Sequence, residues 1–382
     1  MREHAHDDPH QLALQARRYP DLPISAIAEQ LQARRKAQSK LPEWWASEGI
    51  VFPPALSLEQ CSSEVTARYK SSLLGGQRLV DLTGGAGVDT YYLSQSFAQT
   101  DYVEQDEALA NLARHNFAVL GASSVRVHAV TAETFLIDFP EPIDAIYLDP
   151  ARRDAQSRKV FQLADSTPDV LALQDDLLAK ATSVLIKTAP LLDIPATLRV
   201  LKYVSQVHVV AVRNEVKEVL YRLDRGYAGE PSVTAVDLQS SSEEPFTFLR
   251  SEETSAVATY ADPLTYLYEP HAALMKAGAF KLIAQRFGLS KLHPNTHLYT
   301  SDQPVPNFPG RTFRCRAVLP YRKKALPAYL PALKANVSTR NFPDPVATVR
   351  KRLGLVDGGN VYLFATRLKN GQLRLIITEK LV

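Results

Sequence analysis

The hydrophobic positions of the first part of the chain recur at helical spacing. The pattern is clearest over 24–34, where Ala, Leu and Gln also favour a helix. A second helix is predicted from Ser57 to Leu74. Ser57 would be its N-cap, and Gln60 three residues later would complete a capping box. The sequence therefore predicts a helical N-terminal region at 1–70.

From Arg78 the pattern changes to short apolar strands that alternate with helices. Such alternation predicts an α/β fold, with a parallel sheet and helices on both of its faces. The last two predicted strands are joined by a short loop and should form an antiparallel hairpin. The sequence thus predicts an α/β domain at 71–226. Its expected strands are 78–82, 101–104, 125–128, 144–149, 183–187, 207–212 and 218–223, and its expected helices are 88–97, 106–120, 168–182 and 194–204.

The rest of the chain predicts smaller α+β units. Residues 227–262 are richer in Ser, Glu and Thr, which is typical of a linker or a peripheral strand pair. Together with an expected helix at 271–287 and a strand at 312–319, they give a linker and small α+β domain at 227–320. A basic α+β domain is predicted at 321–382. Its expected elements are a strand at 336–339, a helix at 345–353 and two strands, 361–367 and 373–379, joined at Asn370-Gly371.

Composition narrows the class of protein. Of the 382 residues, 45% are hydrophobic and 22% are charged, as in soluble globular proteins. No apolar run approaches the roughly 20 residues that cross a bilayer, and the N-terminus lacks the apolar segment of a secretory signal. Two cysteines, Cys61 and Cys315, cannot build a four-ligand zinc site or a disulfide framework. We therefore expect a cytoplasmic protein with no metal and no membrane partner.

Charge is distributed unevenly along the chain. Residues 271–382 hold 19 Lys and Arg against four acids, a net +15, while the remainder carries −12. Such asymmetry favours a polyanion as the partner of the basic end, namely RNA. The alternative is that the basic end docks on the acidic half of the same protein. The residues expected to hold RNA phosphates are Arg314, Arg316, Arg322, Lys323, Lys324, Arg350, Lys351 and Arg352.

A glycine-rich turn carries the clearest candidate chemistry. An apolar strand ends at Asp81, passes through Gly85-Ala86-Gly87 and opens a helix, so that backbone N–H groups are available to a ligand. The dinucleotide fingerprint requires a third glycine, but Thr90 stands there. An acid at the strand end would repel a pyrophosphate and would suit an ammonium group. A nicotinamide oxidoreductase is therefore disfavoured.

The segment Asp-Leu-Thr-Gly-Gly-Ala-Gly resembles motif I of class I S-adenosylmethionine-dependent methyltransferases. The resemblance implies a Rossmann-like, seven-stranded methyltransferase sheet and S-adenosyl-L-methionine as cofactor. It also implies that Asp81, Gly85 and Gly87 hold the methionine end of this cofactor. Thr83 belongs to the same site, at a position where the family often has glycine.

Two further positions extend the predicted cofactor site. Glu104 ends the next strand, and an ionised glutamate can accept hydrogen bonds from two ribose hydroxyls. Thr131 and Ala132 follow the third strand, where the family usually has an Asp-Ala pair that touches the adenine. The alternative interpretation of Thr131 and Ala132 is a loop that simply opens a helix.

The segment Asp149-Pro150-Ala151-Arg152-Arg153 follows the fourth strand. It resembles the Asp/Asn-Pro-Pro-aromatic motif of enzymes that methylate nucleobase nitrogens, in which the acid or amide and a proline-fixed carbonyl accept hydrogen bonds from the target amine. Asp149 and Pro150 would fill these roles. Ala151 replaces the second proline, and Arg152 replaces the aromatic residue but can also stack on a base.

No cysteine lies in the predicted catalytic domain, so the nucleophile of C5-pyrimidine methylation is not expected. Cys61 is interpreted as a small buried residue in a helix. Lys187-Thr188-Ala189-Pro190 and Asn214-Glu215 also fall near the ends of strands. Whether they line a substrate pocket stays open at this point.

The arrangement of the whole chain is similar to bacterial methyltransferases that carry a THUMP-like domain. The resemblance implies ferredoxin-like and THUMP-like C-terminal domains, and THUMP domains imply RNA. The function predicted is transfer of a methyl group from S-adenosylmethionine to a nucleobase nitrogen in structured RNA, either tRNA or rRNA. The alternatives are a methyltransferase that acts on a protein or small molecule, and a non-catalytic RNA-binding factor with a methyltransferase fold.

Overall fold

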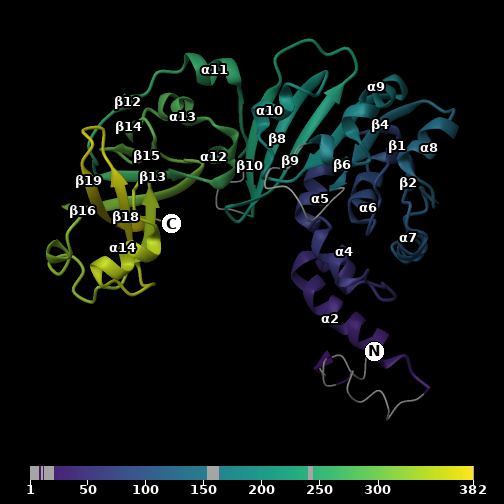
Figure 1. Cartoon of the computed structure of the whole chain (residues 1–382), viewed down its shortest axis with the longest axis horizontal. Helices are drawn as coiled ribbons and strands as arrows, with labels where there is room; N and C mark the ends of the chain where they lie inside the picture. Colours follow the sequence, from purple (N-terminus) through teal and green to yellow (C-terminus); the bar gives the residue numbers. More distant parts are fainter. Residues whose placement is uncertain (1–7, 10–11, 13–20, 153–162, 240–243, 382) are drawn as a thin grey trace. The chain divides into compact units, whose positions relative to one another are not determined.

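The computed structural model of the protein describes residues 8, 9, 12, 21–152, 163–239 and 244–381 (Figure 1). The chain forms two compact units. The first comprises Met1–Ser205 and Val219–Gly229, and the second comprises Gln206–Glu218 and Glu230–Val382. Neither unit is one continuous stretch of chain.

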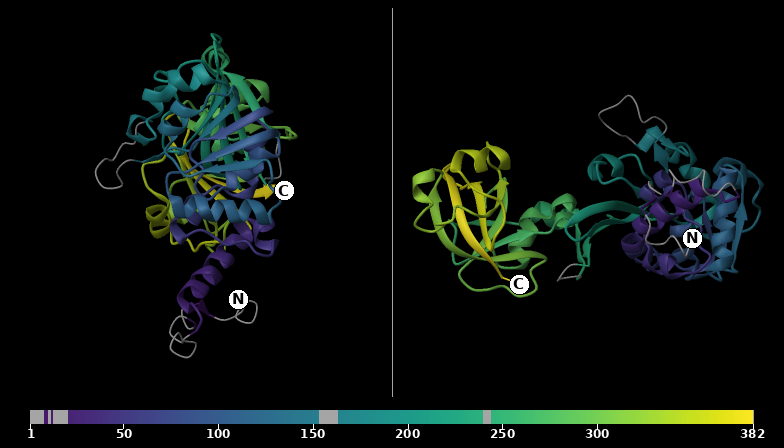
Figure 2. Two further views of the ribbon diagram at one scale, coloured as in Figure 1. Left: turned by 90° about the vertical axis from the view of Figure 1, so that its right-hand side faces the viewer. Right: turned by 90° about the horizontal axis from the view of Figure 1, so that it is seen from below.

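The strands of the first unit form a sheet with the order β3-β2-β1-β4-β7-β9. All of these neighbours are parallel except β7 and β9, which are antiparallel. Helices lie on both sides of the strands (Figures 1 and 2), as the alternating pattern predicted. These strands are β1 (Gly76–Asp81), β2 (Phe97–Val103), β3 (Val125–His128), β4 (Ile143–Leu148), β7 (Ala181–Thr188) and β9 (Glu215–Asp224).

The helices of this unit begin at the places where polar caps are available. Asp106 accepts hydrogen bonds from the amides of Ala108 and Leu109, so α7 begins directly after β2. Asp169 caps α9, because its side chain accepts a hydrogen bond from the Ala172 amide. The helices are α2 (Ile24–Lys40), α3 (Pro42–Ala46), α4 (Ala55–Gln60), α5 (Glu64–Ser71), α6 (Val88–Ser94), α7 (Glu107–Val119), α8 (Ala132–Asp138), α9 (Val170–Lys180) and α10 (Ile194–Leu198).

The prediction of one helix from Ser57 to Leu74 is wrong. The structure has two helices, α4 and α5, separated at Cys61–Ser63. The N-cap is Ser63, whose side chain accepts a hydrogen bond from the Thr66 amide, and not Ser57. Cys61 is therefore the C-cap residue of α4 and does not lie inside a helix.

Three further strands enlarge the sheet. β8 (Val204–Val212) lies beside β9 and completes the order of seven strands, β3-β2-β1-β4-β7-β9-β8. Arg213 and Asn214 join β8 to β9 with φ values of 51° and 65°, the left-handed pair that a two-residue hairpin requires. β10 (Ser232–Leu238) and β11 (Phe246–Leu249) extend the sheet to nine strands. For residues 227–262 the sequence predicted either a linker or a peripheral strand pair, and the structure has the strand pair.

The second unit also contains an eight-stranded sheet with the order β12-β14-β15-β13-β16-β19-β18-β17. Val349 and Leu353 of its last helix join a hydrophobic cluster with Leu363 and Leu375 of two strands. Its elements are α11 (Arg250–Ser255), β12 (Thr259–Tyr260), β13 (Tyr266–Pro270), α12 (Ala272–Ala277), α13 (Phe280–Arg286), β14 (Ser290–His293), β15 (Thr296–Ser301), β16 (Gly310–Pro320), β17 (Asn336–Arg340), α14 (Val346–Leu353), β18 (Val361–Arg367) and β19 (Leu373–Leu381).

The single helix predicted at 271–287 is also two helices. Gly278 has a φ of 86° and ends α12, because this left-handed conformation cannot continue a right-handed helix. Over the described ranges, no helix is both long enough and apolar enough to span a bilayer.

Candidate active site

The glycine-rich loop between β1 and α6 has a shape that only glycine allows. Gly85 has a φ of 51° and Gly87, the N-cap of α6, a φ of 78°. A Cβ atom added to Gly84 would lie 2.1 Å from the Tyr102 ring, and one on Gly87 would lie 2.9 Å from Phe117. Next to a Cβ on Gly85 the nearest atom would be the Thr83 carbonyl oxygen at 3.9 Å. The Tyr102 and Phe117 rings thus pack tightly against the loop at Gly84 and Gly87, whereas space remains beside Gly85.

Asp81, the last residue of β1, is fully buried under this loop. One carboxylate oxygen accepts a hydrogen bond from the Thr83 amide at 3.0 Å, and the other accepts one from the Thr90 hydroxyl at 2.6 Å. Burial raises the pKa of Asp81 to about 7, although both hydrogen bonds favour the ionised form. Among the described residues no Lys, Arg or His forms an ion pair with it. A cationic ligand such as an ammonium group would suit this carboxylate.

Glu104 follows β2 and reaches back to the same loop. One of its carboxylate oxygens accepts a hydrogen bond from the Gly85 amide at 2.9 Å, and the other accepts one from the Asp106 amide at 2.9 Å. Each carboxylate oxygen has a further lone pair that can accept from a ligand hydroxyl. Asp81, Gly85 and Glu104 are therefore gathered at one edge of the sheet, and they fit a ligand that carries an ammonium group and a ribose.

Thr131 and Ala132 lie at the start of α8. Thr131 is the N-cap, and its hydroxyl oxygen accepts a hydrogen bond from the Thr134 amide at 3.2 Å. The same hydroxyl lies 3.0 Å from the Thr134 hydroxyl, and Ala132 is buried. The Thr131 side chain is thus already used for capping.

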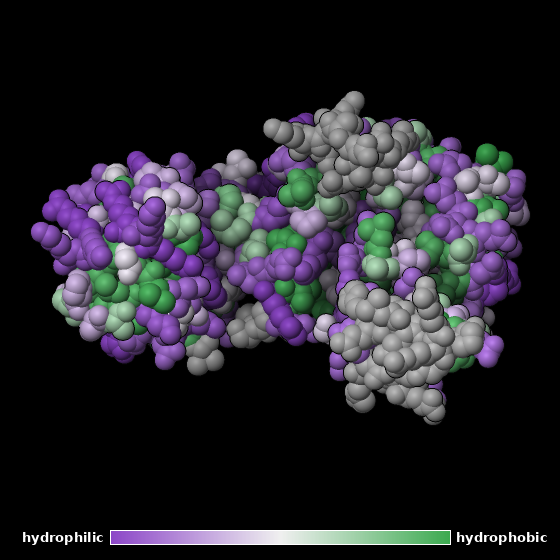
Figure 3. All heavy atoms as spheres, turned by 60° about the horizontal axis from the view of Figure 1, so that its bottom comes forward, coloured by the Kyte–Doolittle hydropathy of each residue, from purple (hydrophilic) through white to green (hydrophobic). Residues whose placement is uncertain are grey.

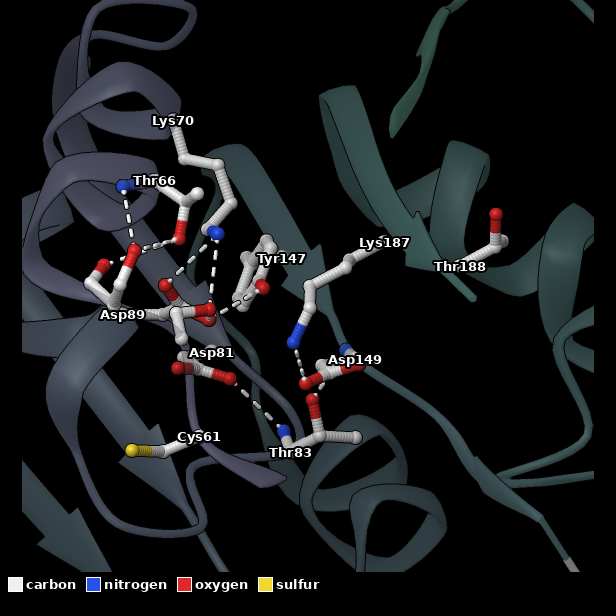
Figure 4. Close-up of polar contacts among 12 residues, drawn as sticks. Cys61, Thr66, Lys70, Asp81, Thr83, Asp89, Tyr147, Asp149, Lys187 and Thr188 are labelled. Carbon is white, nitrogen blue, oxygen red and sulfur yellow. Dashed lines mark hydrogen bonds and ion pairs between the residues drawn. The ribbon is translucent and has the colours of Figure 1, made fainter. Parts of the chain in front are cut away.

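Asp149 follows β4 and is linked to the glycine-rich loop. Its amide donates a hydrogen bond to the Thr83 hydroxyl at 2.6 Å, and its carboxylate forms an ion pair with Lys187 at the end of β7. Figure 4 shows the Lys187 ammonium and the Thr83 hydroxyl converging on Asp149. The structure therefore joins three strand ends, those of β1, β4 and β7, through side chains.

The segment that follows Asp149 is described only in part. Pro150 is partly buried, and Ala151–Arg152 form the two-residue strand β5, which pairs with β6 (Ser166–Thr167). Only the backbone of Arg152 is described, and Arg153 lies outside the described residues.

A buried network lies beside Asp81 and was not predicted. The Lys70 ammonium, which is fully buried, lies 3.2 Å from Asp89 and donates to the Ser62 hydroxyl at 3.0 Å. Ser62 in turn donates to Asp89 at 2.8 Å. Tyr147 also donates to Asp89, at 2.7 Å (Figure 4). Burial alone would raise the pKa of Asp89, but Lys70, Lys187 and the two hydroxyls outweigh it and lower this pKa.

These partners come from distant parts of the chain. Ser62 and Lys70 lie in the N-terminal region, Asp89 on α6 and Tyr147 on β4. The helical N-terminal region therefore supplies charged core residues to the catalytic sheet. Burial raises the pKa of the Cys61 thiol, which keeps it protonated near neutral pH and unlike a nucleophile. Over the described ranges, no cluster of His, Cys, Asp and Glu could hold a metal ion.

The predicted RNA-binding residues lie in the second unit. Arg314 and Arg316 are on β16, Arg322, Lys323 and Lys324 lie in the following turn, and Arg350, Lys351 and Arg352 form the last turn of α14. Acids neutralise three of them: Arg316 pairs with Glu379, Arg350 with Asp357, and Arg352 with Asp344 at 3.6 Å. Within the described chain, Arg322, Lys323, Lys324 and Lys351 have no such acidic partner.

Comparisons with known proteins relate the chain to two domain families and to methyltransferases. Residues 266–309 match a family model described as a ferredoxin-like domain, and residues 310–380 match a THUMP domain-like model. An uncharacterised S-adenosylmethionine-dependent methyltransferase of Mycobacterium tuberculosis H37Rv is 25% identical over 356 residues, which cover 91% of this chain and 94% of that protein. A crystal structure titled "putative methyltransferase" from Porphyromonas gingivalis W83 is 36% identical with a TM-score of 0.90, and the match covers all of this chain and 96% of that one.

The match to the Porphyromonas gingivalis structure extends over both units and therefore relates the whole chain, not only its catalytic sheet. The residues at the glycine-rich loop fit the cofactor named for the mycobacterial relative, because they provide a carboxylate for an ammonium group and a second carboxylate for ribose hydroxyls. This chain belongs to the same family and is an S-adenosylmethionine-dependent methyltransferase with a THUMP-like domain.

Proposed function

We propose that the enzyme methylates a nitrogen of a nucleobase in structured RNA, either tRNA or rRNA. The observation that carries this proposal is the place of Asp149. It lies at the end of β4, hydrogen-bonded to Thr83 of the glycine-rich loop, with a side chain that is 35% exposed. A carboxylate in that position can accept a hydrogen bond from a target amine.

The cofactor site is proposed residue by residue. Asp81 and the backbone at Thr83, Gly85 and Gly87 would hold the methionine end of S-adenosylmethionine, which supplies the methyl group as a sulfonium. Glu104 would hold the ribose. Thr131 and Ala132 would border the adenine through their main chain, because the Thr131 hydroxyl caps α8.

On the substrate side, Asp149 and the Pro150 carbonyl would accept hydrogen bonds from the amine and direct its lone pair at the methyl group. Methyl transfer is an in-line displacement, so most of the rate enhancement comes from positioning the amine nitrogen against the methyl carbon of the sulfonium. Arg152 would contact the base or an adjoining phosphate.

Support for RNA comes from the charge of the second unit. A Cβ atom on Gly354 would lie 2.8 Å from the Lys323 ammonium, so the basic turn at Arg322–Lys324 meets the end of α14, where Lys351 lies. Figure 3 shows long hydrophilic side chains on this unit next to a small hydrophobic area. Its exposed large apolar residues include Tyr329, which is 51% exposed. Arg352 lies over the Tyr321 ring, 4.7 Å from its centroid, and cations beside an aromatic ring are suited to phosphates and bases.

The domain division is also kept as a proposal: a helical region at 1–70, the methyltransferase domain at 71–226, a linker and small α+β domain at 227–320 and the basic domain at 321–382. A cytoplasmic location is proposed with it, since the substrate would be met there.

The proposal is tested by mass spectrometry of nucleosides from tRNA and rRNA of a strain without the gene. We expect one methylated nucleoside to be missing, and the purified enzyme to restore it in RNA from that strain. An unchanged nucleoside profile, together with methylation of a protein or a small molecule by the pure enzyme, would favour the alternative substrate classes. A protein that binds RNA but transfers no methyl group would favour a non-catalytic RNA-binding factor.

A further inference from the structure

Lys187 lies directly beside Asp149 in the sheet. The parallel register of β4 and β7 pairs Tyr147 with Leu185 and Leu148 with Ile186, so the next residues along the strands, Asp149 and Lys187, come opposite each other. The Lys187 side chain is only 12% exposed, whereas that of Asp149 is 35% exposed. The lysine therefore forms the covered side of the ion pair, and the carboxylate forms its open side (Figure 4).

Two contacts fix Asp149 from different directions. The Lys187 ammonium binds one carboxylate oxygen, Oδ2, while the Thr83 hydroxyl holds the Asp149 amide at 2.6 Å. A carboxylate has no hydrogen to donate, so it can only accept hydrogen bonds. The remaining lone pairs of Asp149 are thus available only to a group that carries a hydrogen.

We propose that Lys187 is a positioning residue that holds the Asp149 carboxylate in place as a hydrogen-bond acceptor, and that it thereby restricts the target to an exocyclic amine of a base. This inference rests on the proposed function. A ring nitrogen that presents only a lone pair would meet another acceptor at Asp149, and a ring nitrogen that carries an N–H has its lone pair in the π system of the ring and cannot direct it at the methyl group. An exocyclic amine can donate one N–H to the carboxylate and still direct its lone pair at the methyl group.

The reaction balances without a further reactant. The nitrogen lone pair forms the N–C bond while the C–S bond breaks, and the sulfur keeps the bonding electrons as a neutral thioether. The nitrogen gains the positive charge and then loses one of its two original protons to water. Asp149 stabilises the charge as it develops, and Lys187 keeps that carboxylate in place.

The test compares five proteins: wild type, Lys187→Met, Lys187→Arg, Asp149→Ala and the double variant Lys187→Met with Asp149→Ala. The probe is total RNA from a strain without the gene, with labelled S-adenosylmethionine as methyl donor. We expect Lys187→Met to lower the rate at saturating substrates about 100-fold, as a displaced reactive geometry does, with little change in KM. Lys187→Arg should recover much of that loss. Lys187→Met should have no further effect in the Asp149→Ala background, because the lysine acts through Asp149.

Affinity for S-adenosylhomocysteine and the thermal midpoint show that each variant is folded. Crystal structures of wild type and Lys187→Met with S-adenosylhomocysteine give a readout that is independent of activity, and the Asp149 carboxylate should change orientation in the variant. If it does not move, or if Lys187→Met keeps the wild-type rate while Asp149→Ala is inactive, the positioning role is wrong. A methyl group found on a ring nitrogen or a carbon contradicts the target class.

Failure of the proposed function gives a different result. Full activity of Asp149→Ala removes Asp149 from the mechanism, and a wild-type enzyme that methylates no RNA removes the RNA substrate. In the second case the crystal structures still decide whether Lys187 positions Asp149.

Discussion

The two halves of the site are built in different ways. On the cofactor side, Asp81 is held by Thr83 and Thr90, two and nine residues away, and Gly85 bonds Glu104 nineteen residues away. On the substrate side, the partners of Asp149 are Thr83 and Lys187, which are 66 and 38 residues away. The cofactor half is a local structure of one strand–loop–helix unit and the next strand. The substrate half exists only once distant strands have paired.

This difference determines what a substitution can disturb. In the proposed cofactor half, the backbone amides of Thr83 and Gly85 hold the carboxylates of Asp81 and Glu104, and a change of the Thr83 side chain leaves these amides in place. In the substrate half, the contacts are made by side chains, so one substitution removes a whole interaction. We therefore expect the two halves to be separable by experiment.

The largest effect is expected for Asp149→Ala. Methyl transfer should fall at least about 100-fold, because removal of one preorganised hydrogen-bonding group typically costs that much. Affinity for S-adenosylhomocysteine, measured by calorimetry, should stay within about twofold of wild type. The matched control is Asp175→Ala, which removes a carboxylate that is 70% exposed and pairs with Lys202. A loss of cofactor affinity in Asp149→Ala that is as large as its loss of methyl transfer would mean that the two halves are not separable.

The next effect concerns Asp81 and pH. Its pKa of about 7 lies above the ordinary value, so the carboxyl is mostly protonated below pH 7 and ionised above it. A ligand ammonium binds the ionised form, and affinity for S-adenosylhomocysteine should therefore rise about tenfold between pH 6 and pH 8. Asp81→Asn should weaken binding and abolish this pH dependence. Glu104→Gln should also weaken binding, but the affinity should still rise between pH 6 and pH 8. A flat profile in the wild type would show that Asp81 does not bind a cation.

A smaller effect is expected when charge is removed from the basic turn of the second unit. Arg322→Gln, Lys323→Gln and Lys324→Gln together should lower the slope of log affinity for RNA against log salt concentration by about two, at roughly 0.7 per phosphate contact. Binding of S-adenosylhomocysteine should be unchanged. The control removes the same charge from three acid-paired lysines, Lys36, Lys202 and Lys217. If instead the triple variant melts at a lower temperature with unaltered RNA affinity, the basic turn stabilises the protein and does not bind RNA.

The smallest effect belongs to Thr131→Ala. Loss of the α8 N-cap should lower the free energy of unfolding by about 1 kcal/mol, which denaturant titration can measure. Affinity for S-adenosylhomocysteine should change little, because the hydroxyl is bonded to Thr134. Thr131→Ser keeps the cap and should match wild type. A clear loss of affinity in Thr131→Ala alone would assign the hydroxyl to the adenine and extend the cofactor half to α8.

Sequence reasoning predicted where the residues of the proposed cofactor half lie in the fold. The acid, the glycines and Glu104 stand at short, characteristic spacings, and strand–turn–helix periodicity placed them at the correct sheet edge. The alternation of strands and helices also predicted the α/β fold, which is confirmed by the strand order and by the relatives.

What the sequence did not predict depends on contacts across the fold. Lys187 was noted only as a residue near a strand end, since nothing in the sequence pairs it with Asp149. The Lys70–Asp89 contact joins α5, which precedes β1, to α6, which follows β1, and a buried lysine looks like a surface lysine in a sequence. The break between α4 and α5 was missed for a related reason: Ser62 is used by Asp89 and Lys70, and this favours a cap at Ser63 over a continuous helix.

The path of β9 has a consequence for synthesis of the protein. The first unit ends with Val219–Gly229, which is made after the hairpin segment Gln206–Glu218 that belongs to the second unit. Until residue 224 has left the ribosome, β7 therefore lacks its antiparallel neighbour and is an open edge of an apolar sheet. A chain that stops near residue 205 would keep every residue proposed to bind the cofactor and would still expose that edge to other chains. Aggregation, rather than loss of chemistry, should limit such a truncated protein.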